Sequence, residues 1–331
     1  MSEEQKKKCP YYYWNIAAAC VHLANFFGTF VLSFPEFPDL GGRVGFILTD
    51  DYLKWLGDEP GEICPGNNTF AETCSKYFRP IFNIGNQTVQ RQEGRLVLEL
   101  EWLIIAFHFL SFLFQISVCR SKERYETSVE QQGMNYLRFV EYSISASLMM
   151  VCIAIISGIS DIYAVVGIFF LTSVTMGFGL ICEYLLSIYT DSKNIKFKKD
   201  VRRLAVCSHL TGWVSMLAAY GQVFATFATS LDRSNVPAPW FVYVIVIGLF
   251  LLFNIFGFIQ LWQVCFKLKC CCYNPKRWCY RIKCLLCKAE QLTEKDKDER
   301  CNILIESWYV ANSLGSKTLL GWLIYFNLLR R

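Results

Sequence analysis

Residues 302–329 read NILIESWYVANSLGSKTLLGWLIYFNLL. The stretch is apolar and longer than the about 20 residues that a helix needs to cross a bilayer. Lys317 is the only charged side chain between Glu306 and Arg330. At about 1.5 Å per residue it lies about 22 Å from Asn302, well inside the hydrocarbon. The stretch therefore predicts a membrane-spanning helix with a lysine near its middle.

An unpaired ammonium group at that depth costs several kcal/mol, so a lysine there points to a function. A lysine close to a helix end can extend its amine to the interface, but Lys317 is far from both ends. A buried amine suits a Schiff base with a carbonyl cofactor, and Gly315 and Ser316 leave room for a bulky ligand. We therefore predict that Lys317 binds a cofactor covalently.

The composition also indicates a membrane protein. Hydrophobic residues make up 53 % of the chain and aromatic residues 16 %, which is too apolar for a soluble chain of this charge content. Seven apolar spans can be drawn, separated by polar or Pro-containing loops. They cover residues 11–34, 96–119, 134–157, 162–190, 204–230, 240–266 and 302–329. We predict an all-α fold in which residues 1–331 form a single seven-helix domain, embedded in a lipid bilayer and without affinity for nucleic acid.

The basic residues of the loops predict the orientation. They precede the first span and occupy the connections after the second, fourth and sixth spans, whereas the short loops on the opposite side carry only Arg233 besides the C-terminal arginines. By the positive-inside rule the N-terminus is cytoplasmic and the C-terminus extracellular. The N-terminal sequence, MSEEQKKKCPYYYW, runs directly into the first span without a cleavage site, so we expect no signal peptide.

The first loop, residues 35–95, supports the same orientation. Asn67 and Asn86 each begin an N-glycosylation sequon, a signal that is read in a eukaryotic secretory lumen. Cys64 and Cys74 are the only cysteines in the predicted extracellular loops, and we expect them to form a disulfide. A loop of this length is more than a connector, so we predict an extracellular cap. We expect a multi-pass protein of the eukaryotic plasma membrane or a related cell membrane.

The connection before the last span, residues 267–300, is predicted to be a basic, cysteine-rich cytoplasmic loop. Its cysteines could bind zinc, but their irregular spacing favours palmitoylation or reduced thiols, with the basic side chains on anionic lipid. We therefore predict no metal site. The cysteines concerned are Cys270, Cys271, Cys272, Cys279, Cys284 and Cys287.

A protonated Schiff base at Lys317 needs a nearby anion. Glu141 lies about 12 Å along the third span from its cytoplasmic end. Helical side chains tilt toward the N-terminus of their helix, so Lys317 extends toward Glu141. In an alternative reading Glu141 only neutralises Arg138 at a spacing of i, i+3. Ser313, one turn before Lys317 on the same face, can hydrogen-bond the Schiff base.

Other polar and aromatic side chains within the spans are weaker candidates. His22, His108 and Glu183 could together line a hydrated cavity, or each could be a satisfied packing group. In the sixth span Phe253 and Phe256 offer aromatic walls for a polyene, although aromatic helix faces usually serve packing.

These residues resemble a known family. Seven spans with a lysine in the last one are similar to retinal-binding rhodopsins, and the cytoplasmic N-terminus is similar to heliorhodopsins in particular. The segment Arg138-Phe139-Val140-Glu141-Tyr142-Ser143-Ile144-Ser145-Ala146-Ser147 resembles the heliorhodopsin counterion helix, and Ser313-Leu314-Gly315-Ser316-Lys317 resembles the retinal attachment motif. Glu183-Tyr184, His22 and His108 also fit family positions. The resemblance covers the seven spans, but not the sequence of the first loop or the cysteine-rich segment.

The resemblance implies all-trans retinal on Lys317, light-driven isomerisation to the 13-cis form, Glu141 as counterion and a homodimer. It also implies a sensory or regulatory role with a cytoplasmic signalling partner, not an enzyme. Two alternatives stay open: a light-dependent proton channel or pump, and a seven-helix transporter or scaffold without retinal. We expect no active outward pumping, because Glu141 and Glu183 lie on the cytoplasmic half and only Glu99 and Glu101 lie near the outer end of the second span.

Overall fold

A computed structural model describes residues 10–33, 45–47, 97–159, 161–233, 238–268 and 294–329. The predicted disulfide Cys64–Cys74, the sequons at Asn67 and Asn86 and most of the cysteine-rich loop, residues 269–293, lie outside this part of the chain.

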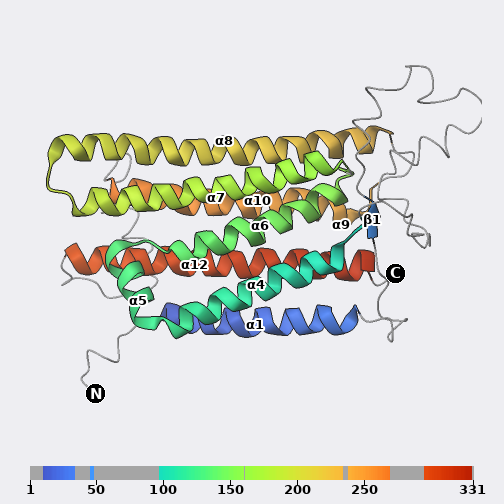
Figure 1. Ribbon diagram of the computed structural model, residues 1–331, viewed down its shortest axis with the longest axis horizontal. Coiled ribbons are helices and arrows are strands. Elements are labelled where there is room, and N and C mark those ends of the chain that lie inside the picture. Colours follow the sequence, from blue (N-terminus) through green and yellow to red (C-terminus); the bar gives the residue numbers. More distant parts are fainter. Residues whose placement is uncertain are drawn as a thin grey trace, which may run out of the picture.

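The described chain is a bundle of long helices (Figure 1). It begins with α1 (Pro10–Leu32), α4 (Leu100–Arg120), α6 (Tyr136–Ile156), α7 (Ile162–Asp191) and α8 (Ile195–Arg233). The short α9 (Trp240–Tyr243) and the π-helix η5 (Val244–Gly248) continue directly into α10 (Leu249–Lys267). The last helix, α12 (Glu294–Ile324), continues into a short π-helix, η6 (Tyr325–Leu329).

Smaller elements join the long helices. Strands β1 (Gly45–Ile47) and β2 (Val97–Glu99) pair antiparallel, with Phe46 opposite Leu98. The connection from α4 to α6 contains α5 (Lys122–Glu126) and the π-helix η4 (Thr127–Gln132), and Gly133 closes η4 at φ 63°. An L-residue with a side chain rarely adopts this left-handed conformation, so glycine fits that turn.

Six helices of the described chain are long and apolar enough to cross a membrane. They are α1, α4, α6, α7, α8 and the continuous helix from α9 to α10, so the predicted membrane bundle is confirmed by length and composition. The last predicted span is helical but does not reach the same apolarity, because α12 carries Asn312, Ser313, Ser316 and Lys317 in its middle. Of these four, Ser313, Ser316 and Lys317 are buried.

The core explains this burial. α6 lies at the centre of the bundle, where 15 of its residues are buried among α4 and α7. α7 packs along α8, α1 along α4, and α12 along α1 and α10. The polar face of α12 is therefore directed into the bundle, where polar side chains of α4 and α6 contact it.

The basic segments of the described chain gather at one end of the bundle (Figure 1). We call this the basic end; it carries α5, the turn between α7 and α8, and the start of α12, whereas β1 and α9 lie at the opposite end. α1 begins at the basic end and α12 finishes at the opposite end.

One helix is longer than its predicted span. The span 204–230 begins nine residues after the start of α8, because the highly charged segment 196–203 was predicted to be part of the loop. The Asn194 side chain accepts hydrogen bonds from the backbone N–H groups of Lys196 and Phe197 at 3.1 and 3.3 Å. This capping, together with the high helix propensity of Lys and Arg, extends the helix into the basic segment.

Candidate functional site

Lys317 lies in a fully enclosed position. It is 2 % exposed, and its ammonium group forms an ion pair with the Glu141 carboxylate of α6. Lys317 Nζ also lies 2.6 Å from Ser111 Oγ of α4, and Ser111 Oγ lies 2.6 Å from Glu141 Oε1. We call these three residues the Lys317 site. The structure brings the predicted attachment residue and the predicted counterion into direct contact.

The Lys317 site explains how two charges can stay inside the bundle. A buried ion pair is tolerated when its geometry is close and further hydrogen bonds satisfy the remaining polar groups. Ser111 supplies such a group from a third helix, and Lys317 Nζ lies 5.0 Å from the centroid of the Tyr142 ring. Ser111 was missed by sequence reasoning; its only signal was an isolated hydroxyl in an apolar span.

Ser313 is buried one turn before Lys317, near the Tyr142 side chain. The Tyr142 hydroxyl donates to the backbone carbonyl of Tyr309 at 3.3 Å. In the part of the chain that the structure describes, Lys317 is bonded to Ser111 and Glu141. The predicted bond from Ser313 to a Schiff base therefore stays a prediction.

An apolar cavity begins beside Tyr142. It has a volume of about 60 Å³ and lies among α6, α7, α8, α10 and α12. Phe253 and Phe256, the predicted aromatic walls, both line it, and the Phe256 ring lies 5.3 Å from the Tyr142 ring. The remaining lining residues are Phe139, Thr175, Met176, Gly179, His209, Gly212, Trp213, Met216, Asn254, Gly257, Gln260 and Tyr309.

Two glycines shape the walls of this cavity. A Cβ atom on Gly257 would overlap the Trp213 ring, and one on Gly179 would overlap the Phe139 ring. The cavity is smaller than the about 300 Å³ at the lower limit of usual ligand pockets. An elongated apolar ligand would therefore need the aromatic side chains to change rotamer. The chemistry of the lining suits a polyene, and Tyr142 connects it to the amine of Lys317.

His209 lines the cavity and contacts two other lining side chains. Its Nδ1 lies 3.1 Å from Gln260 Oε1, and its Nε2 accepts a hydrogen bond from Trp213 Nε1 at 3.0 Å. Because the indole can only donate, the imidazole is fixed as the tautomer that carries its proton on Nδ1. Gln260 in turn donates to the Gly179 carbonyl at 2.8 Å. His209 and Gln260 thus add polar groups to the wall of an otherwise mostly apolar cavity.

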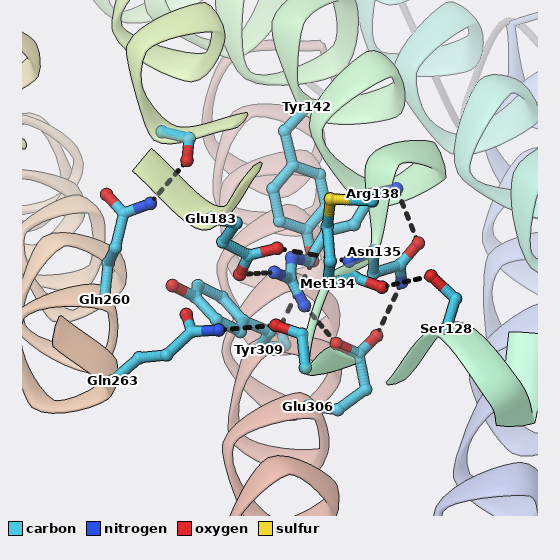
Figure 2. A network of polar contacts seen from close by, with 12 residues as sticks. Ser128, Met134, Asn135, Arg138, Tyr142, Glu183, Gln260, Gln263, Glu306 and Tyr309 are labelled. Carbon is cyan, nitrogen blue, oxygen red and sulfur yellow. Dashed lines mark hydrogen bonds and ion pairs between the residues drawn. The ribbon is translucent and has the colours of Figure 1, made fainter. Parts of the chain in front are cut away.

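A second ionic group lies nearer the basic end. Figure 2 shows the Arg138 guanidinium between the carboxylates of Glu183 and Glu306, with which it forms two ion pairs. The guanidinium also stacks on the Tyr309 ring, 3.8 Å from its centroid. We call Arg138, Glu183 and Glu306 the Arg138 cluster. Arg138 does not pair with Glu141, the alternative raised by the sequence, because its two terminal nitrogens, Nη1 and Nη2, bind Glu306 and Glu183.

Neighbouring donors complete the Arg138 cluster. The Asn135 backbone N–H donates to Glu183 at 3.1 Å, and the Asn135 side chain donates to Glu306 at 2.7 Å. The Tyr125 hydroxyl of α5 donates to Glu306 at 2.8 Å. Burial, and then the charge of Glu306, raise the pKa of Tyr125 well above its ordinary value, so the phenol remains a neutral donor.

Glu306 was missed as a site residue. It lies eleven residues before Lys317 on α12, and three helical turns place both residues on one face. This spacing could have indicated from the sequence that Glu306 faces the interior of the bundle, as Lys317 does. The partner Arg138 is 168 residues away in the sequence, so the pairing itself requires the fold.

The two histidines of the first spans form a separate pair. His22 Nδ1 and His108 Nδ1 lie 3.2 Å apart, and both rings are buried. His108 also packs against Gly321, one turn beyond Lys317 toward the opposite end. The sequence suggested that Glu183 could line one hydrated cavity together with His22 and His108. In the structure Glu183 instead forms an ion pair with Arg138.

A small polar cavity separates the two ionic groups. Its volume is about 10 Å³, and Glu141, Arg138, Glu306 and Gln115 all line it. Among the described residues, Gln115 Oε1 and Arg138 Nε have no hydrogen-bond partner. A cavity of this size and polarity accommodates about one water molecule.

Comparison with known proteins agrees with this geometry. Residues 67–269, more than half of the chain, match the heliorhodopsin family. The match includes Arg138, Glu141 and Glu183, and it ends before α12, which carries Lys317 and Glu306. A search of curated proteins found no match.

Proposed function

The chain belongs to the heliorhodopsin family, and we propose that it is a light-sensing retinal protein. The observation that carries the proposal is the buried contact between Lys317 and Glu141 beside an apolar cavity. The family implies a retinal chromophore, and the proposed attachment point is the Lys317 amine. Retinal would supply light absorption and the all-trans to 13-cis isomerisation.

The residues of this chain have distinct parts in the proposal. Glu141 is the negative counterion that keeps a cation at the Lys317 nitrogen stable inside the bundle. Ser111 orients the Glu141 carboxylate through their 2.6 Å contact. Phe253, Phe256 and Tyr142 exclude water from the cavity and restrict the rotation of a ligand within it.

We also propose that α12 crosses the membrane as a seventh span, with the basic end of the bundle in the cytoplasm. Two observations support this. The polar side chains in the middle of α12 contact other helices instead of facing lipid, and the basic connections share one end of the bundle. In intact cells an N-terminal tag should be hidden from antibody and a C-terminal tag accessible; the reverse labelling would contradict the orientation.

The proposed role is sensory, not enzymatic. α12 carries both Lys317 and Glu306, so a change at the chromophore can shift Glu306 and its bond to Tyr125 of α5. α5 lies at the basic end, where a cytoplasmic signalling partner would bind. A homodimer is part of the same proposal by resemblance to the family, and a eukaryotic plasma membrane or related membrane is part of it because of the sequons at Asn67 and Asn86.

A light-dependent proton channel is the second candidate. The polar cavity between Glu141 and Glu306 favours it, because a water there would connect the Lys317 site with the Arg138 cluster. Voltage-clamp of illuminated cells with equal pH on both sides separates the candidates. The sensory proposal predicts no steady current; a current only under an imposed voltage or pH gradient would indicate a channel, and a steady outward current at zero voltage a pump.

The direct test of retinal binding is reconstitution. The purified protein is mixed with all-trans retinal, its visible spectrum is recorded, and the retinal isomers are extracted before and after illumination. We expect a visible band and an increase of the 13-cis isomer in light. Absence of a visible band would leave a seven-helix transporter or scaffold as the function.

A further inference from the structure

The turn between α7 and α8 is strongly basic. Residues 191–204, which we call the basic turn, contain six Lys and Arg side chains against Asp191 and Asp200. Five of the six are exposed, and Lys198 is half-buried over the Tyr189 ring at 5.1 Å. The six are Lys193, Lys196, Lys198, Lys199, Arg202 and Arg203.

Few of these charges are neutralised within the protein. Arg203 lies 3.7 Å from Asp200, but the two side chains are 68 % and 69 % exposed. Such a surface pair contributes little. The basic turn therefore presents a net positive surface to whatever surrounds this end of the bundle.

The basic turn also exposes apolar side chains. Ile195 is 84 % exposed, Leu204 57 % and Phe197 48 %. Large apolar side chains placed among cations match the boundary between headgroups and acyl chains, where the apolar part enters the bilayer and the ammonium groups meet phosphates.

The length of α8 places the basic turn at that depth. α8 has 39 residues, about 58 Å at 1.5 Å per residue, against about 30 Å of hydrocarbon. The excess carries the helix into the headgroup layer. In Figure 1 the basic turn joins α7 to α8 at the basic end of the bundle.

The neighbouring connection at the basic end differs. Between residues 120 and 130, Arg120, Lys122 and Arg124 are matched by Glu123, Glu126 and Glu130. Lys122 approaches Glu126 to 3.9 Å. This segment lies at the same end of the bundle but has no net charge. It therefore serves as a control for any effect of the positive charge of the basic turn.

We propose that the basic turn is a binding site for anionic phospholipid headgroups, with Lys193, Lys196 and Lys199 contacting phosphates and with Ile195 and Phe197 entering the acyl region. The proposal requires that the bundle is in a membrane, but it does not require retinal or the proposed orientation. Its failure would thus leave the photoreceptor function untouched.

The test is lipid selectivity of the full chain. The protein is reconstituted into vesicles of equal phosphatidylcholine and phosphatidylserine, extracted in mild detergent, and its retained lipids are quantified by mass spectrometry. We expect phosphatidylserine to be enriched about fivefold or more over phosphatidylcholine. Fivefold corresponds to about 1 kcal/mol, the contribution of a single basic side chain near an anionic surface. The enrichment should fall when the extraction is done at high salt, because exposed charges are screened.

Matched variants locate the site. The triple variant Lys193→Gln, Lys196→Gln, Lys199→Gln should lose most of the enrichment, and Arg120→Gln, Lys122→Gln, Arg124→Gln should keep it. Replacing Lys193, Lys196 and Lys199 by arginine retains their positive charge and should retain the phosphatidylserine enrichment. This variant checks that a loss in the Gln variant comes from the missing charge and not from a disturbed helix. Equal enrichment in the Gln variant of the basic turn, or equal loss in both Gln variants, would overturn the proposal.

Discussion

Two buried ionic groups lie within one bundle, and they are built differently. The Lys317 site has one cation and one carboxylate, joined by a single hydroxyl, next to an apolar cavity. The Arg138 cluster has one cation and two carboxylates, surrounded by Asn135, Tyr125 and the Tyr309 ring. The Lys317 site therefore has few polar contacts and lies next to a cavity, whereas every charged group of the Arg138 cluster has several polar or aromatic neighbours.

The choice of cation explains this difference. A lysine amine can lose its proton and react with a carbonyl group, so it suits a site that must bind a cofactor covalently. An arginine stays protonated and presents several donors in a fixed plane. Arg138 therefore fastens α6 to α7 and α12, while Lys317 remains available for chemistry.

The largest expected effect on stability is at the Arg138 cluster. Arg138→Leu leaves two buried carboxylates without their cation, which should lower the free energy of unfolding by about 3–5 kcal/mol. Thermal unfolding of the purified protein measures this. Arg138→Lys is the matched control and should recover part of the loss; a Leu variant as stable as the native chain would show that the cluster does not hold the helices together.

The second prediction concerns colour and separates the two groups. Glu141→Gln removes the negative charge beside Lys317, so the retinal-bound protein should absorb further to the red or lose its visible band at neutral pH. Glu183→Gln removes a carboxylate of similar burial from the Arg138 cluster and should leave the band in place. If both variants, or neither, change the spectrum, Glu141 is not the specific counterion.

A smaller effect is expected at Tyr125. Tyr125→Phe removes the hydroxyl that donates to Glu306, while Asn135 still donates to the same carboxylate oxygen. The loss of one hydrogen bond to a charged group should cost about 1.5–3 kcal/mol at most, and the absorption band should not move. The decay of the illuminated state, followed by flash spectroscopy, should change because α5 is then less firmly joined to α12; an unchanged decay would argue against this route of output.

Much of the bundle could be predicted from apolar length and loop charge. The contact between Lys317 and Glu141 was also accessible, because the isolated charge of Lys317 requires a partner and the third span offers a carboxylate within its reach. Glu306 was overlooked because its partner Arg138 lies on a helix far away in the sequence. Similarly, the grouping of Glu183 with His22 and His108 was based on depth alone, and depth does not determine which neighbours a side chain faces.

The central claim is that the Lys317 amine binds retinal covalently, and one spectrum tests it most directly. Lys317→Ala is purified with all-trans retinal present and treated with hydroxylamine, beside the native protein. We predict that the native protein shows a visible band and the variant shows none, while Lys267→Ala, a control lysine in α10, retains the band. A hydroxylamine-resistant visible band in Lys317→Ala would contradict the account.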